Sequence, residues 1–165
     1  MNEIPTTPRV RVTGRPHDEC GVCAIVGSEE ASKLAYLCLY ALQHRGQETA
    51  GIVSARIDRG RPHHCIHRGM GLVADVFPQE TLDRLRGRVA IGHVRYSTTG
   101  EPVPSNTQPL ASSLRHGPVA LAHNGNLTNA HILRHALKGG GAIFQTTIDS
   151  EVIVHLLSHV RNVDF

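Results

Sequence analysis

The order of strand-like and helix-like segments is the feature that most constrains the fold of this 165-residue chain. Short apolar runs predict strands at 21–27, 50–57, 89–96 and 118–125, and the turn segment DRGRP predicts that HHCIHRG, residues 63–69, forms a strand paired with 50–57. Spacings of three and four residues between apolar positions predict helices after Ser28, over 78–85, from Thr128 or Asn129 to 139, and after Asp149. Because strands and helices do not alternate strictly, we expect a layered α+β domain rather than a doubly wound parallel sheet.

The apolar positions also predict which face of each helix is buried. The buried positions expected in the first helix are Leu34, Leu37, Cys38, Ala41 and Leu42. Those expected in the two last helices are Ile132, Leu133, Ala136 and Leu137, and then Val152, Ile153, Leu156 and Leu157. The pattern therefore places Cys38 in the core.

Charge and hydropathy argue against two classes of partner. The formal net charge is +3, and the 17 Lys and Arg residues are scattered without a basic stripe, so we expect no nucleic-acid partner. No apolar run approaches the ~20 residues that span a bilayer, so we expect no membrane-spanning helix.

Residues 1–19 contain Pro, Thr and Arg but no apolar segment of the kind found in secretory signals. Their composition alone predicts a flexible leader. Without a secretory signal, the four cysteines at positions 20, 23, 38 and 65 predict reduced thiols in a cytoplasmic protein rather than a disulfide framework.

The segment DECGVCAIVG, residues 18–27, places Cys20 and Cys23 in a C-x-x-C spacing. The spacing alone allows a thiol–disulfide pair, half of a zinc site, or one reactive and one packing cysteine. In a strand, residues three apart face opposite sides, which disfavours a shared role.

A second group of possible ligands is HHCIH, in which His63, Cys65 and His67 share one face of a predicted strand. Three ligands on one short strand are seldom spaced to close a tetrahedron. We therefore interpret this segment as a half-exposed edge strand, and we expect no metal site.

Polar residues cluster where predicted elements end. Arg95 ends one strand, Asn124 and Gly125 end another, and Asp149 precedes the last helix. Each has an ordinary interpretation, as an ion-paired residue, a turn and a helix cap respectively. Together, however, an Arg and an Asp can bind the two charged ends of an amino acid, and an Asn amide beside a Gly N–H offers two donors to an oxyanion.

Six blocks of sequence resemble the glutaminase domain of the amidophosphoribosyltransferase family, also called glutamine phosphoribosylpyrophosphate amidotransferases. In chain order they are ECGVCAIVG, LQHRGQETAGI, GMGLVADVF, IGHVRYSTTG, LAHNGNLTNA and TTIDSE. They differ from the LEYRGYDSAG, HTRWATHG and HNGIIEN blocks typical of glucosamine-6-phosphate synthase, a sister class II glutamine amidotransferase. Members of the family that this chain resembles catalyse the first committed step of purine synthesis.

The resemblance implies an N-terminal-nucleophile hydrolase fold, a four-layer αββα sandwich of antiparallel sheets, truncated here. Residues 1–19 would be a propeptide or flexible leader, and residues 20–165 a class II glutaminase domain that is incomplete at its C-terminus. A phosphoribosyltransferase domain with its Mg²⁺, and in one branch of the family a [4Fe–4S] cluster, would lie beyond Phe165. No cofactor is implied within this chain. The implied partners are glutamine, phosphoribosyl pyrophosphate through the further domain, and identical subunits of a homo-oligomer.

The family's catalytic residues match Cys20 as nucleophile, with the Asn124 side chain and the Gly125 N–H as oxyanion hole. Cleavage between Glu19 and Cys20 would free the α-amine of Cys20, whose pKa of about 7.7–8.0 suits a general base. A thiolate would then attack the glutamine carboxamide, release ammonia and form a thioester that water hydrolyses to glutamate. An unprocessed chain should be inactive, because an amide nitrogen is not basic.

The family's substrate ligands match Arg95 for the α-carboxylate of glutamine and Asp149 for its α-ammonium group. Thr98 would lie in the loop that closes over glutamine, and Arg45 would support the nucleophile.

Two positions depart from the family pattern: Cys23 stands where relatives carry an apolar residue, and Ile148 where they carry Ser. Two other functions stay open on the sequence alone. One is the glutaminase domain of another class II amidotransferase, such as glucosamine-6-phosphate synthase. The other is a non-catalytic thiol or zinc-binding module.

Overall fold

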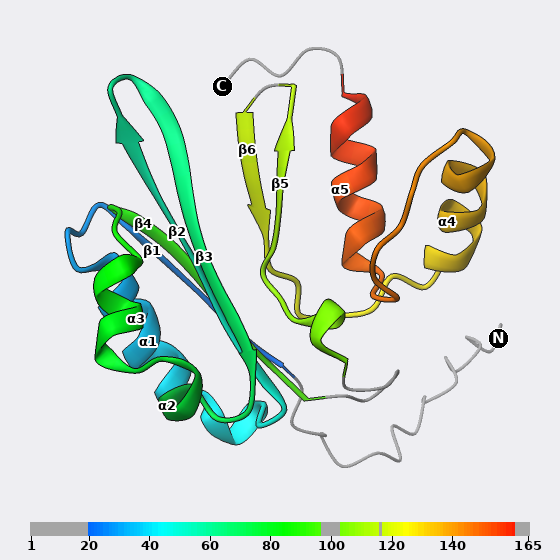
Figure 1. Ribbon diagram of the computed structural model, residues 1–165. Helices are drawn as coiled ribbons and strands as arrows, with labels where there is room; N and C mark the ends of the chain where they lie inside the picture. The colour runs from blue at the N-terminus through cyan, green and yellow to red at the C-terminus, as the bar shows by residue number, and fades with distance from the viewer. Residues whose placement is uncertain (1–19, 97–102, 116, 161–165) are drawn as a thin grey trace, which may run out of the picture.

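Two antiparallel sheets lie face to face between two layers of helices (Figure 1). The computed structural model describes residues 20–96, 103–115 and 117–160. The proposed leader 1–19, its cleavage residue Glu19, and Thr98 lie outside the described residues. In the described part of the chain, every helix is too short or too polar to cross a bilayer.

The first sheet contains four of the five predicted strands in the order β1-β4-β2-β3, all antiparallel. Their bounds are Gly21–Val26 for β1, Thr49–Asp58 for β2, Arg61–Met70 for β3 and Val89–Arg95 for β4. In the register, Gly21 lies opposite Val94, so Cys20 and Arg95 meet at one end of the sheet. β3 is an edge strand, as predicted for HHCIH.

Helices α1 to α3 cover the outer face of this sheet (Figure 1). α1 spans Ala31–Ala41 and is followed by the short 3-10 helix η1 (Gln43–Arg45), while α2 spans Val73–Val76 and α3 spans Gln79–Arg84. The core between these helices and the sheet consists mainly of Ala31, Ala35, Leu39, Ala50, Ile52, Val73, Val76, Phe77, Leu82, Leu85, Ala90 and Val94.

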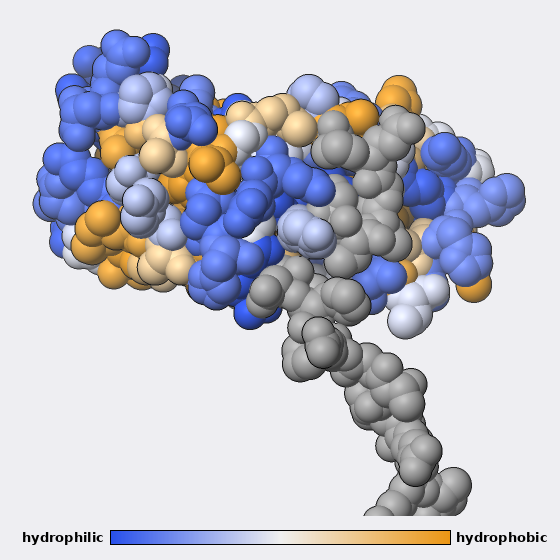
Figure 2. Space-filling model, turned by 90° about the horizontal axis from the view of Figure 1, so that it is seen from below, coloured by the Kyte–Doolittle hydropathy of each residue, from blue (hydrophilic) through white to orange (hydrophobic). Residues whose placement is uncertain are grey.

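The predicted buried face of α1 is wrong. Ala31, Ala35 and Leu39 are fully buried, whereas Leu37 is 59% exposed and Cys38 is only half-buried. Small alanine side chains let the helix lie close to the sheet, so the face with Ala31, Ala35 and Leu39 packs inward, while Leu34 and Leu37 face out. Seen from below, hydrophobic surface accordingly gathers at the end of the molecule that carries these helices (Figure 2).

The second sheet is a hairpin of β5 (Leu110–Leu114) and β6 (Gly117–Leu121). β5 was not predicted, because LASSL has neither β-branched residues nor a long apolar run. β6 ends at Leu121, four residues earlier than the predicted strand. Beyond it, the side-chain amide of Gln108 replaces a neighbouring strand: it accepts the N–H of His123 at 2.8 Å and donates to its carbonyl at 3.3 Å.

At Gly51, the first sheet lies close to the segment that leads into the second sheet. A Cβ on Gly51 would lie 2.0 Å from the main-chain oxygen of Gln108, so only glycine leaves room for the segment that leads from the 3-10 helix η2 (Pro104–Asn106) into β5. This contact sets the position of the second sheet, and with it the site, over β2.

The outer layer on the other side contains α4 (Ala130–Gly139) and α5 (Ser150–His159). α5 covers the hairpin, and α4 lies beyond α5 (Figure 1). The predicted buried faces are only partly correct: Val152 is fully buried, but Ile132 is 60% exposed and no residue of α4 is buried. A two-stranded sheet is too narrow to cover both helices, so α4 packs on α5 at its margin.

Candidate active site

Cys20 is held where the two sheets meet. The side-chain amide of Asn124 donates to the Cys20 carbonyl at 2.7 Å, and Arg45 Nε donates to the same oxygen at 3.5 Å. The Cys20 thiol lies 3.7 Å from the Tyr96 carbonyl. Three segments that are distant in sequence therefore fix one residue, which is partly exposed and accessible to a ligand.

A cavity of about 450 Å³ opens beside Cys20. Of the predicted site residues, it is lined by Cys20, Arg95, Gly125 and Asp149. Asn124 reaches the site through its bond to Cys20, and Arg45 supports Cys20 from outside the cavity. The predicted convergence of strand ends and helix starts is thus confirmed, and the volume suits a small molecule.

Arg95, the last residue of β4, is only 6% exposed. Its Nη1 donates to the Asn106 main-chain oxygen at 3.2 Å. A buried guanidinium at the wall of a cavity provides fixed donors for a carboxylate.

His93, two residues before Arg95, lies on the same face of β4 and is fully buried. Burial lowers the pKa of His93 to about 4, and the nearby charge of Arg95 adds to this effect. The imidazole is therefore neutral at pH 7 and adds no second positive charge beside Arg95.

Gly125 follows Asn124 in a backbone conformation that requires glycine. Its φ is +156°, and a Cβ there would lie 2.9 Å from His123 Nε2. The main-chain N–H of Gly125 and the Asn124 amide are adjacent donors at the edge of the cavity, as an oxyanion hole needs.

Asp149 precedes α5 but makes no side-chain capping bond to it. Its Oδ2 instead accepts the N–H of Leu127 at 2.6 Å, and its Oδ1 lies 3.7 Å from His123 Nδ1. The carboxylate therefore faces the segment that carries Asn124. There it can accept an ammonium group from the cavity.

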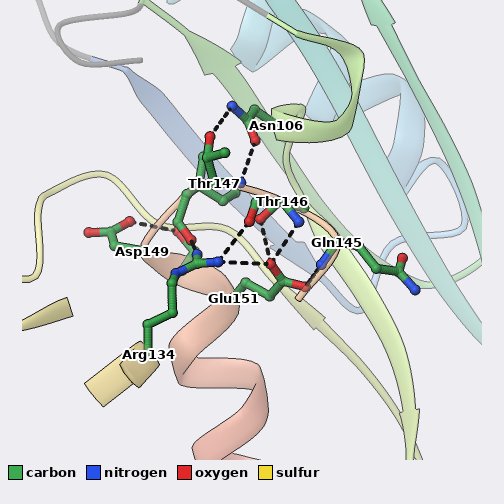
Figure 3. Close-up of polar contacts among 9 residues, drawn as sticks. Asn106, Arg134, Gln145, Thr146, Thr147, Asp149 and Glu151 are labelled. Carbon is green, nitrogen blue, oxygen red and sulfur yellow. Dashed lines mark hydrogen bonds and ion pairs between the residues drawn. The ribbon is translucent and has the colours of Figure 1, made fainter. Parts of the chain in front are cut away.

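Side chains from three elements hold the segment 145–148 that leads to Asp149 (Figure 3). Glu151 accepts the main-chain N–H groups of Gln145 and Thr146 at 2.8 and 2.9 Å. Arg134 of α4 donates to the carbonyls of Thr146 and Ile148 at 2.8 and 2.6 Å.

Asn106 holds the same segment from the opposite side, through Thr147 (Figure 3). Sequence reasoning missed Asn106, Gln108, Arg134 and Glu151, whose partners lie up to 41 residues away. The run of four polar residues SNTQ, 105–108, in a proline-containing loop was the available signal for Asn106 and Gln108.

Cys23 lies on the opposite face of β1 from the cavity and packs against the core. Its thiol donates to the Ala35 carbonyl at 3.7 Å, and burial, with Cys38 nearby, raises the pKa of Cys23 to about 11. The interpretation of Cys23 as a packing residue is confirmed.

His63, Cys65 and His67 occupy alternate positions of the edge strand β3, so they share one face of the sheet as predicted. His63 is exposed, Cys65 packs against the core, and the His67 ring contacts Phe77 with centroids 5.5 Å apart. Within the described ranges, no group of three or more His, Cys, Asp or Glu residues is arranged to hold a metal ion.

Comparison with known proteins identifies the family. The model of the glutamine amidotransferase domain matches residues 93–164. Amidophosphoribosyltransferase 2, chloroplastic, of Arabidopsis thaliana is 50% identical over 144 residues, which are 87% of this chain and 25% of that protein. The amidophosphoribosyltransferase of Lacticaseibacillus casei is 49% identical over 142 residues, 86% of this chain and 71% of the relative.

A solved structure shares the fold. Glutamine phosphoribosylpyrophosphate amidotransferase from B. subtilis, complexed with ADP and GMP, superposes with a TM-score of 0.77 at 43% identity, over 87% of this chain and 30% of that one. The predicted αββα sandwich of the N-terminal-nucleophile hydrolase type is therefore confirmed. The chain spans about a quarter of the length of curated relatives such as the A. thaliana protein. It belongs to the amidophosphoribosyltransferase family, of which it carries the glutamine amidotransferase domain.

Proposed function

We propose that this domain hydrolyses glutamine to glutamate and ammonia through a thioester on Cys20. The observation that carries the proposal is the joint placement of Cys20, Arg95, Gly125 and Asp149 around one cavity, with the Asn124 amide bonded to Cys20. These groups match the parts of glutamine: a cation for the carboxylate, an anion for the ammonium group, and a thiol with two donors for the carboxamide.

In the proposed reaction, the free α-amine of mature Cys20 takes the thiol proton. The Sγ–C bond forms as the carboxamide oxygen becomes an oxyanion, which the Asn124 and Gly125 donors stabilise. The C–N bond then breaks, and the proton leaves with ammonia. Water attacks the thioester, which releases glutamate and restores the thiol.

For the full-length protein, we propose that the ammonia displaces pyrophosphate from phosphoribosyl pyrophosphate to give 5-phosphoribosylamine for purine synthesis. Similarity to enzymes named amidophosphoribosyltransferase supports this step. The cofactors of the further domain, a homo-oligomeric state and a cytoplasmic location stay predictions. The A. thaliana relative is described as chloroplastic.

The test uses the full-length protein and its Cys20→Ala variant. We expect the variant to lose glutamine hydrolysis but to keep synthesis with free ammonia, because only the nucleophile is removed. Glutaminase activity that persists in the variant would contradict the proposal.

A further inference from the structure

We infer that Asn106 is a positioning residue that fixes the distance between Arg95 and Asp149, and that it thereby makes the site selective for a ligand carrying both a carboxylate and an ammonium group. The inference rests on the proposed function, in which Arg95 and Asp149 bind the two charged ends of glutamine. It adds a residue that touches neither end of the substrate.

Asn106 ends the 3-10 helix η2 and is 1% exposed. Its main-chain oxygen accepts Arg95 Nη1 at 3.2 Å. Its side chain makes two bonds to Thr147, donating to Oγ1 at 2.7 Å and accepting the main-chain N–H at 3.0 Å. One buried residue thus joins the end of β4 to the segment that carries Asp149.

The other bonds on that segment come from the far side. Arg134 and Glu151 belong to α4 and α5, the same outer layer that carries Asp149 (Figure 3). They fix the shape of the segment but do not join it to the first sheet. The Asn106–Thr147 pair makes that connection, and Asn106 lies behind the cavity wall rather than in its lining.

The spacing matters because both charged groups of an α-amino acid are attached to one carbon atom. Binding both at once requires that the cation and anion of the site are already at the matching distance. If the Asn106–Thr147 connection is lost, Arg95 can still bind a carboxylate and Asp149 an ammonium group, but the affinity gained when one ligand binds both falls. The affinity of a substrate that carries only one of the two groups does not depend on this distance.

Loss of the Asn106 side chain should have little effect on the rate of the chemical step at Cys20. In the described part of the chain, the Asn106 side chain bonds to Thr147 and not to Cys20 or Asn124, so the Asn–Thr pair acts on the binding of the far end of the substrate. The expected signature is therefore a higher KM for glutamine at nearly constant kcat.

The experiment compares two substrates of the full-length, processed enzyme: glutamine and 5-amino-5-oxopentanoate, which is glutamine without its α-amino group. Asn106→Ala should raise KM about tenfold for glutamine, leave kcat within about twofold, and leave KM for the analogue within about twofold. Thr147→Val, which removes the hydroxyl but keeps the main-chain N–H, should change KM in the same direction by less. Asn129→Ala, an exposed Asn without a side-chain capping bond, is the matched control and should change nothing.

A double variant separates positioning from general damage. Asn106→Ala with Thr147→Val should be no worse than Asn106→Ala alone, because both remove the same connection. If Asn106→Ala does not fold, the test uses Thr147→Val alone. The ratio of kcat/KM for glutamine to kcat/KM for the analogue should then be lower in this variant than in the wild type. An unchanged ratio in an enzyme whose activity depends on Cys20 overturns this inference and leaves the proposed function intact. A wild-type enzyme without Cys20-dependent glutaminase activity overturns both.

Discussion

The side-chain amide of Asn124 donates a 2.7 Å hydrogen bond to the main-chain carbonyl of Cys20, 104 residues earlier in the chain. This bond brings the proposed oxyanion donor to the proposed nucleophile before any substrate is present. It also joins the loop after β6 to the start of β1, so the site is assembled from both sheets.

Asn124→Ala should lower kcat for glutamine hydrolysis by about 10²–10³, with little change in KM, because the lost donor acts mainly on the oxyanion of the transition state. Steady-state kinetics of the full-length enzyme with glutamine measures both constants. A higher KM at unchanged kcat would show that Asn124 binds the ground state instead. Asn129→Ala serves again as the control.

Cys23→Ala should keep glutaminase activity, because the Cys23 thiol packs on the far side of β1. Since burial raises the pKa of Cys23 to about 11, its thiolate is scarce until the pH approaches that value. Mass-spectrometric mapping with iodoacetamide should therefore find Cys23 unmodified in folded protein at pH 8. Modification of Cys23 in the folded protein at that pH, or loss of activity in the variant, would refute the packing role.

His93 should make folding stability depend on pH. Its pKa is about 4 in the folded protein and about 6.5 when unfolded, so the unfolded chain binds more protons between these values. The contribution of the neutral ring is present above pH 6.5 and is lost as the pH falls toward 4. Compared with His93→Asn, the wild-type urea midpoint should fall more steeply over this range. Parallel curves would contradict a buried neutral imidazole.

Gly51→Ala should destabilise the domain by more than about 3 kcal/mol, because the added Cβ would overlap the Gln108 carbonyl. The two sheets would have to separate where Gln108 aligns the loop before Asn124. Thermal unfolding of the full-length protein measures the loss. Gly139→Ala, where an added Cβ meets nothing within 4 Å, is the matched control. Equal melting temperatures for the two variants would show that Gly51 is not needed for close contact.

The strands β1, β2 and β4 were predictable because each contains a short apolar run, and β3 because the turn segment DRGRP joins it to β2. The buried face of α1 was not, since choosing between an alanine face and a leucine face depends on how close the sheet lies. The strand β5 and the narrow second sheet left no such pattern. The buried face of α1 and the strand β5 therefore depend on tertiary packing, which the sequence pattern does not reveal.

Arg95, Asn124 and Asp149 could be predicted as a group because they stand where strands end or helices begin. Asn106 and Arg134 could not, because their importance depends on partners in other elements. A buried polar residue in a loop has no periodic signature. Only the fold shows which carbonyl or N–H it reaches.

The most direct test of the central claim is mass spectrometry of the active full-length enzyme after inactivation with 6-diazo-5-oxo-L-norleucine, a glutamine analogue that alkylates reactive thiols. The account predicts one adduct, on Cys20, in a peptide that begins at Cys20 with a free α-amine. An active enzyme that still carries residues 1–19, or an adduct on any other cysteine, would contradict it.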